Sequence, residues 1–314
     1  MAEWALEQRW ESPSGTIRYD VFGGGPPLVL VHGTPSSTYL WRHVIPKLAS
    51  ERTVYAYDLL GYGASEKRDN QDVSLGAQTR LLAQLLDHWE LEQPAIVGHD
   101  FGGAITLRTH LLERRPFSAI ALLDPVALGP WGSPFFRLVR DNVGVFQQIP
   151  ATIHHAIVAA YLRGAFHRQM SDEALAPYVE PWLGVEGQAA FYRQIAQADQ
   201  RYTDEVEPLY GQITVPLLIL WGEEDDWISP ETGHRLHALI PHSQLQLIPA
   251  AGHFLQEDAP EAVASGLTST AALLSGIAAD SSKAGLNSGI SRSGGAAIGA
   301  EVHGSRSRMT SLSN

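Results

Sequence analysis

A sharp turn that carries an aspartate is the feature of this sequence that most restricts its fold. Residues 95–97 (AIV) form a short apolar run, residues 98–102 (GHDFG) follow at once, and a helix-forming stretch comes next. A strand, a Gly-x-nucleophile-x-Gly turn and a helix make up a nucleophile elbow, in which the glycines let the central side chain stand exposed above a sheet. The sequence therefore predicts a sheet with Asp100 raised at the end of one strand.

The central residue of such a turn is usually serine, and an aspartate selects a different chemistry. A carboxylate that attacks an ester would form an anhydride, which is unfavourable. A carboxylate that attacks a saturated carbon bearing a leaving group forms an ordinary ester, which water can then cleave. Asp100 therefore points away from esterases and towards enzymes that open carbon–halogen bonds or epoxides.

Short apolar runs typical of strands alternate with longer helical patterns along most of the chain. The helical patterns cover residues 74–90 and 102–115, and Pro116 would stop the second. The strand-like runs are residues 28–31, 53–57, 95–97, 118–123, 215–220 and 245–248. This alternation predicts an α/β fold, with a mostly parallel central sheet flanked by helices.

A stretch of different composition interrupts the predicted sheet. Residues 136–196 follow a helical pattern before strand-like runs resume, and a helical insertion of this kind is typical of a cap over an active site. The Ser/Gly/Ala-rich composition beyond about residue 269 predicts a disordered tail, with a cloning scar or a frame-shifted end as the alternative. We assign this tail no function. We therefore divide the chain into a first core part (1–127), a helical cap (128–205), a second core part (206–268) and a Ser/Gly/Ala-rich tail (269–314).

Composition disfavours several kinds of partner. The 34 acidic and 22 basic residues give a formal net charge of −12, so we expect neither nucleic acid nor a membrane as partner. The absence of cysteine excludes disulfides and thiolate chemistry. We find no phosphate-binding loop and no zinc-type histidine spacing, and we expect no cofactor and no metal. With no secretory signal or long apolar segment in the sequence, the expected location is cytoplasmic.

Four segments carry polar residues in one chain order. They are residues 32–35 (HGTP), the turn with Asp100, residues 221–225 (WGEED) and residues 251–254 (AGHF). Together they resemble the α/β-hydrolase superfamily, and specifically its aspartate-nucleophile branch of epoxide hydrolases and haloalkane dehalogenases. The resemblance covers roughly residues 15–268.

The resemblance implies a role for each matching residue. Asp100 would be the nucleophile, His253 the base and Asp225 the acid that orients the base. The backbone N–H groups of Thr34 and Phe101 would form the oxyanion hole.

A second position could supply the acid. Asp124 ends the strand-like run after the elbow helix, and related enzymes can place the acid there; Asp226 is also adjacent to Asp225. We favour Asp225 and expect Asp124 to be structural. His32 is expected to fix its loop by hydrogen bonds rather than to transfer protons.

The leaving group is the more difficult prediction. A halide needs N–H donors, which such enzymes take from a tryptophan after the nucleophile and from an asparagine or second tryptophan, yet here Phe101 and Thr34 hold the two obvious positions. The segments 39–42 and 170–181 nevertheless resemble dehalogenases. The halide alternative therefore stays open.

An opening epoxide instead needs a donor for its oxygen, which the family supplies from two cap tyrosines. Residues 191–193 (FYR) resemble the aromatic-Tyr-Arg motif that carries one of them, which makes Tyr192 the first candidate. Tyr161 and Tyr178 are candidates for the second. These tyrosines favour epoxide opening over halide release.

The sequence as a whole predicts a hydrolase that acts on a small, apolar electrophile and water. An ester would form on Asp100, and a water activated by His253 would cleave it. Epoxide hydrolase is the favoured activity and haloalkane dehalogenase the alternative. A hydrolase-fold receptor that binds a small ligand with little turnover is the alternative of another class.

Overall fold

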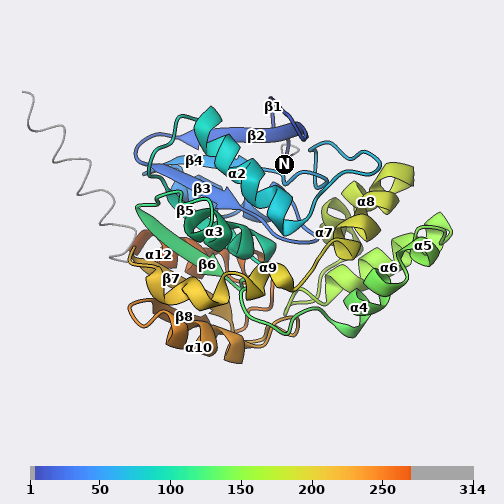
Figure 1. The fold of residues 1–314 in the computed structure, drawn as a ribbon. Coiled ribbons are helices and arrows are strands. Elements are labelled where there is room, and N and C mark those ends of the chain that lie inside the picture. The colour runs from blue at the N-terminus through green and yellow to red at the C-terminus, as the bar shows by residue number, and fades with distance from the viewer. Residues whose placement is uncertain (1–3, 270–314) are drawn as a thin grey trace, which may run out of the picture.

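One eight-stranded sheet runs through residues 4–269, the part of the chain that the computed structural model describes (Figure 1). Its strand order is β1-β2-β4-β3-β5-β6-β7-β8, in which β1, β2 and β4 pair antiparallel and the other pairs are parallel. The strands are β1 (Gln8–Ser12), β2 (Gly15–Gly23), β3 (Pro27–Val31), β4 (Thr53–Tyr57), β5 (Ala95–His99), β6 (Ala119–Leu123), β7 (Leu217–Gly222) and β8 (Gln244–Ile248). This arrangement confirms the predicted α/β fold.

The central strands β3, β5, β6 and β7 are buried along almost their whole length. Parallel strands with helices on both faces are apolar in continuous runs, which is why the sequence predicts them well. Their register aligns their carboxyl ends, because Val31 pairs with Gly98 and Leu123 pairs with His99 and Leu220. The loops that follow these strands therefore open at one edge of the sheet.

The sequence patterns did not predict β1 and β2. In β2 the buried residues Gly15, Ile17 and Tyr19 alternate with more exposed ones, as expected for an antiparallel strand with one covered face. That signal is an alternation with a period of two rather than a continuous apolar run.

Helices cover both faces of the sheet. Alternate residues of β3 enter separate buried clusters, Val29 and Val31 on one face and Leu28 and Leu30 on the other. The helix predicted at 102–115 ends earlier than expected, at Leu111, and the positive φ of 56° at Arg114 excludes a helix that continues to Arg115. The helices around the sheet are α1 (Ile45–Leu48), α2 (Leu75–His88), α3 (Phe101–Leu111), α10 (Pro230–Leu239), α11 (Leu255–Asp258) and α12 (Pro260–Ser269).

The segment between β6 and β7 is helical and lies beside the sheet (Figure 1). Its helices are α4 (Pro134–Asp141), α5 (Val143–Phe146), α6 (Ala151–Arg163), α7 (Asp172–Val179), α8 (Gly184–Ala196) and α9 (Arg201–Asp204), with 3-10 turns η2 (Glu180–Trp182) and η3 (Glu207–Gln212). Another 3-10 turn, η1 (Thr38–Trp41), follows β3. The division of the chain at 127/128 and 205/206 stays a prediction.

The predicted tail at 269–314 lies outside the described residues except for Ser269, which ends α12. Within residues 4–269, no helix is both long and apolar enough to cross a membrane.

Candidate active site

Asp100 occupies a strained turn between β5 and α3. Its backbone has φ 52° and ψ −118°, a conformation that an L-residue adopts only when its surroundings enforce it. The flanking glycines are required by space. A Cβ on Gly98 would lie 2.4 Å from the Gly102 carbonyl oxygen, and a Cβ on Gly102 would lie 2.2 Å from the Val31 carbonyl oxygen. The turn thus raises the Asp100 carboxylate at the edge where the strands end.

The loop after β3 supplies a backbone donor to this carboxylate. The Thr34 N–H donates to Asp100 Oδ1 at 2.6 Å. A side chain on Gly33 could not be accommodated, because its Cβ would lie 2.4 Å from the same oxygen. Phe101 is the first residue of α3, and an amide at that position has no partner within the helix. Both predicted oxyanion-hole amides therefore border Asp100.

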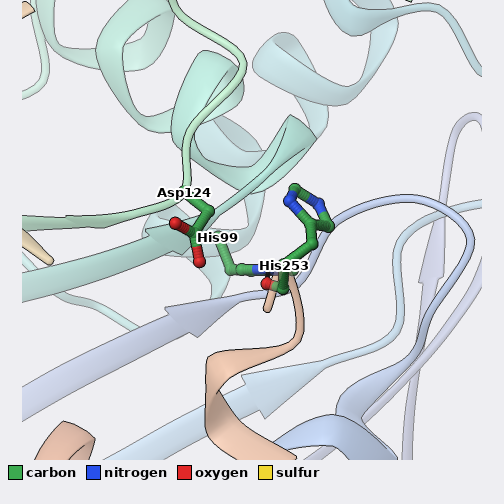
Figure 2. A group of neighbouring side chains, drawn as sticks. All are labelled: His99, Asp124 and His253. Carbon is green, nitrogen blue, oxygen red and sulfur yellow. Dashed lines mark hydrogen bonds between the residues drawn. The ribbon is translucent and has the colours of Figure 1, made fainter. Parts of the chain in front are cut away.

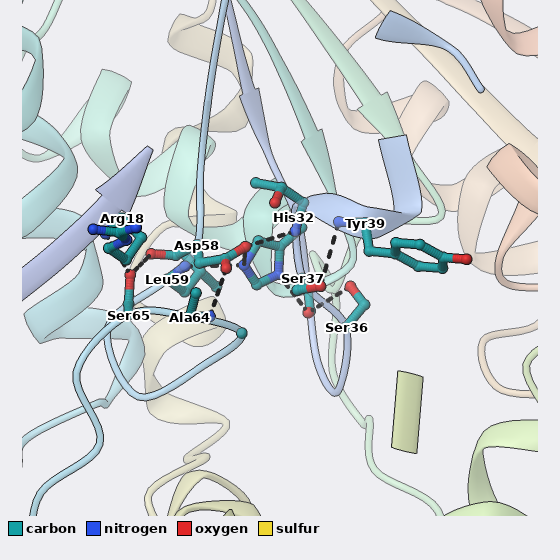
Figure 3. A network of polar contacts seen from close by, with 12 residues as sticks. Arg18, His32, Ser36, Ser37, Tyr39, Asp58, Leu59, Ala64 and Ser65 are labelled. Atoms are coloured by element: carbon teal, nitrogen blue, oxygen red, sulfur yellow. Dashed lines mark hydrogen bonds and ion pairs between the residues drawn. The ribbon is translucent and has the colours of Figure 1, made fainter. Parts of the chain in front are cut away.

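A polar network behind this loop holds it in place (Figure 3). His32 Nδ1 donates to the Gly33 carbonyl at 2.9 Å, and the Leu59 N–H donates to Nε2 at 2.9 Å. Asp58 accepts the N–H groups of Thr38 and Ala64, each at 2.7 Å. Burial lowers the pKa of His32, although the charge of Asp58 opposes this. His32 is therefore a neutral ring that orients the loop, in agreement with the sequence-based interpretation.

The loops after β7 and β8 bring an acid and a histidine to Asp100. His253 Nδ1 donates to Asp225 Oδ2 at 2.9 Å, and His253 Nε2 lies 3.4 Å from Asp100 Oδ2. The other Asp225 oxygen accepts the N–H groups of Trp227 at 2.8 Å and Ile228 at 2.9 Å. All three side chains of the predicted triad therefore meet.

The electrostatic surroundings of His253 favour its charged form. Burial of the ring by itself would lower its pKa, but the charge of Asp225, the hydrogen bond that His253 donates to Asp225 and the nearby Asp100 carboxylate raise the pKa well above its ordinary value. The two carboxylates that contact the ring therefore favour its protonated form. Loss of the Asp100 charge would release that proton more easily.

Asp124 lies under the triad but does not hold the imidazole. Its Oδ1 accepts the Gly222 N–H at 2.9 Å, while its Oδ2 has no hydrogen-bond partner within residues 4–269. Burial and the charge of Asp225 raise the pKa of Asp124 well above its ordinary value. Asp225, and not Asp124, is the carboxylate hydrogen-bonded to His253.

Three neighbouring side chains, those of His99, Asp124 and His253, could together hold a metal ion (Figure 2). The candidate ligand atoms of His99, Asp124 and His253 lie within 4.8 Å of one another and all three residues are buried. His99 Nε2 donates to the His253 carbonyl at 2.9 Å, and burial lowers the pKa of His99 to about 3. An ion there would compete with the pairing of His253 with Asp225, so the arrangement fits the triad better than a metal centre.

Asp100 lies on the wall of a cavity of about 40 Å³, which is room for two or three water molecules. The Trp131 N–H is directed away from this space, because it donates to Thr203 Oγ1 at 2.9 Å. Three lining residues, Thr34, Ser133 and Tyr161, carry a side-chain hydroxyl group, and that of Thr34 donates to Gln194 Oε1 at 2.7 Å. The complete lining is Thr34, Asp100, Phe101, Val126, Trp131, Gly132, Ser133, Phe136, Tyr161, Trp227 and Ile228.

The three predicted cap tyrosines differ in what their hydroxyl groups contact. Tyr161, on α6, lines the cavity, and burial and then the charge of Asp100 raise its pKa. The Tyr178 hydroxyl donates to Glu257 Oε1 at 2.5 Å, outside the cavity lining. Tyr192, on α8, also lies outside the lining. Of the three, Tyr161 is the one near Asp100.

The Tyr192 hydroxyl is paired with a buried histidine. It lies 2.9 Å from His154 Nδ1, and the other ring nitrogen of His154 lies 2.8 Å from the Trp182 carbonyl oxygen. Since a carbonyl can only accept, Nε2 carries the proton of the neutral ring and Nδ1 accepts from Tyr192. The Tyr192 proton is therefore used in the hydrogen bond to His154.

Sequence reasoning missed Ser133, Trp227 and Ile228, which line the cavity. Ser133 was detectable only as a helix cap: it precedes Pro134 and its Oγ accepts the Phe136 N–H at 3.1 Å. Trp227 and Ile228 follow Asp225 by two and three residues, and no pattern marks them.

Comparison with known proteins identifies the family. The model of the α/β hydrolase fold family matches residues 26–260, and the chain belongs to this family of hydrolases. An α/β hydrolase fold protein from Burkholderia ambifaria is 45% identical, with a TM-score of 0.83 over 85% of this chain and 98% of that one.

Haloalkane dehalogenases are among the similar proteins. Haloalkane dehalogenase 2 of Mycobacterium tuberculosis is 29% identical, over 83% of this chain and 94% of its own length. Haloalkane dehalogenase DbeA of Bradyrhizobium elkani shares the fold at 24% identity, with a TM-score of 0.73 over 87% of this chain and 98% of that one. The predicted membership of the α/β-hydrolase superfamily is confirmed.

Proposed function

We propose that this hydrolase opens small epoxides through a covalent ester on Asp100. The observation that carries the proposal is the position of the Asp100 carboxylate, which borders a mostly apolar cavity and faces His253 on its other side. A hydroxyl donor, Tyr161, lines the same cavity. A nucleophile and a hydroxyl donor therefore border one small space, and the base contacts the nucleophile from outside it.

In the first step a carboxylate oxygen of Asp100 attacks an epoxide carbon and the carbon–oxygen bond breaks. The oxygen that leaves takes the proton of Tyr161. The charge of Asp100 helps to raise the pKa of Tyr161, so neutralising that charge in the ester makes Tyr161 a better donor as the reaction proceeds. The proton of His253 then returns to the Tyr161 phenolate, so Tyr161 is restored and His253 becomes neutral.

In the second step neutral His253 removes a proton from water, and the hydroxide attacks the ester carbonyl of Asp100. Asp225 stabilises the imidazolium that forms. The developing oxyanion is met by the Thr34 N–H, and such a donor contributes about 3 kcal/mol. The products are a diol and the original carboxylate, so the cycle releases no net proton.

Haloalkane dehalogenation is the second candidate, because the mycobacterial relative that is 29% identical over most of its length carries that name. Against it, neither Phe101 nor Thr34 has a side-chain N–H for a halide, and the Trp131 N–H is bonded to Thr203. Dehalogenation would release one halide and one proton for each turnover.

Trapping the ester tests the proposal. We expect His253→Gln protein, exposed to separate panels of epoxides and haloalkanes, to gain the mass of an intact epoxide on Asp100, and the variant Asp100→Asn/His253→Gln to gain nothing. A mass gain of an alkyl group only, with halide and proton release by the wild type, would replace the proposal by dehalogenation. Ligand binding without any adduct would indicate a receptor.

A further inference from the structure

Three rings form a continuous stack across the candidate active site. Trp227 stacks on Tyr161 with 4.6 Å between ring centroids and 20° between planes. Its indole also lies 5.0 Å from the His253 ring at a tilt of 33°. The three rings come from the loop after β7, from α6 and from the loop after β8. The Trp227 side chain therefore contacts the ring of the base, His253, and the ring that carries the donor hydroxyl, Tyr161.

The backbone around Trp227 is fixed independently of its indole. The N–H groups of Trp227 and Ile228 donate to Asp225, and the Ile228 carbonyl accepts the Trp221 indole N–H at 3.0 Å. Any non-proline residue at position 227 could make the same backbone contact. The Asp225–His253 hydrogen bond should therefore survive a change of the side chain.

The indole is also confined on its cap side. A Cβ on Gly164, at the end of α6, would lie 3.1 Å from Trp227 Nε1. The edge of the indole therefore lies against the end of α6, while the ring contacts those of Tyr161 and His253.

We propose that Trp227 is a positioning residue whose indole face stabilises the imidazolium of His253 and holds Tyr161 beside Asp100. The faces of aromatic rings attract cations at centroid distances up to about 6 Å, and tryptophan does so most strongly. The part that concerns His253 needs no substrate. The part that concerns Tyr161 rests on the proposed function.

Other charged or titratable groups also face His253. The carboxylates of Asp100 and Asp225 contact it directly, and Asp124 and His99 lie beneath it. The two contacting carboxylates contribute most to its charge. The indole contribution is smaller, and it can be isolated because leucine at position 227 would keep water off the ring while removing the aromatic face.

Histidine NMR measures this contribution directly. In protein with labelled histidine rings, the His253 signal is the one missing from the His253→Gln variant. We expect Trp227→Leu to lower the pKa of His253 by about half a unit, and Trp227→Phe to lower it less. Trp131→Leu is the matched control, since Trp131 lines the same cavity but contacts Phe101 and Phe136, and it should leave the titration unchanged.

The low-field Nδ1–H signal of His253 reports whether its bond to Asp225 persists in each variant. An unchanged titration in both Trp227 variants, with that signal present, would overturn the role of the indole at His253. A kinetic measurement tests whether Trp227 holds Tyr161 beside Asp100. Trp227→Leu should reduce the rate of ester formation about tenfold with a smaller change in KM. Absence of any trapped adduct would refute the proposed function and leave the titration result standing.

Discussion

The strand-end loops and the helical segment beside the sheet contribute to the candidate site in different ways. Asp100, Asp225 and His253 all follow sheet strands, and backbone N–H groups hold both carboxylates. Tyr161 instead stands on a helix and is held by ring contacts with Trp227 and Phe135. The two carboxylates are thus fixed through backbone groups, and Tyr161 is fixed through side chains.

This difference has a chemical consequence. Reactions at Asp100 need a carboxylate and an imidazole at fixed separation, which strand register provides. In the proposed reaction, Tyr161 would recognise the leaving group, and its ring neighbours Phe135 and Trp227 lie far from it in sequence. Substitutions in the core should therefore abolish chemistry, whereas substitutions in the cap should change which leaving group is accepted.

The largest effect is expected at the nucleophile. Asp100→Asn should lower turnover by about 10⁴-fold or more, because an amide is a poor nucleophile. Steady-state rates measured with the substrate identified by trapping would check this, and circular dichroism would verify the fold. Turnover within tenfold of the wild type would show that the ester does not form on Asp100.

The next effect separates the two buried acids. Asp225→Asn should slow hydrolysis of the ester by about 10³- to 10⁴-fold, because the amide favours the wrong tautomer of His253. Asp124→Asn is the matched control and should change the same rate less than about threefold. The measurement is single-turnover decay of the ester followed by mass spectrometry. Equal losses in both variants would mean that the two carboxylates share the task.

The contrast between the strand-end loops and the helical segment also explains which residues the sequence could predict. The runs 28–31 and 95–97 identify buried strands, and the residues that follow them become neighbours through parallel register. Asp100, Asp225 and His253 were therefore accessible to sequence reasoning, which favoured Asp225 over Asp124 but left both open, and the hydrogen bond to His253 distinguishes them. The amphipathic strand β2 was missed because it alternates.

The cap was less predictable for a physical reason. A motif selected Tyr192, yet its hydroxyl donates to His154, which lies 38 residues away on another helix. Nothing local in the sequence marks that pairing. Trp227 was missed likewise, because its importance comes from the rings that it contacts.

A matched pair of tyrosines tests the cap directly. Tyr161→Phe should slow epoxide-dependent ester formation by about 10²-fold, since general acid assistance has at least that size. Tyr192→Phe should change the same rate less than about threefold, because its hydroxyl serves His154. Stopped-flow measurements of ester formation in a His253→Gln background would compare them. A larger loss in Tyr192→Phe would mean that α8 rather than α6 supplies the donor.

The smallest effect concerns stability and its dependence on pH. The pKa of Asp124 is higher in the folded chain than in the unfolded one, mainly through burial, so the folded state binds more protons above the ordinary carboxyl pKa and its stability falls as pH rises. Asp124→Asn should therefore reduce the loss of unfolding free energy between pH 5 and pH 8. Urea titrations at both pH values measure this, and Asp141→Asn, an exposed site on α4, should leave the loss unchanged.

His253 also makes stability fall as pH rises, because its raised pKa adds stability that disappears as pH rises through that pKa. The Asp124 variant should therefore flatten the pH dependence without removing it. A dependence as steep as that of the wild type would show that Asp124 is ionised in the folded protein, and the core would then hold a third charged carboxylate beside His253.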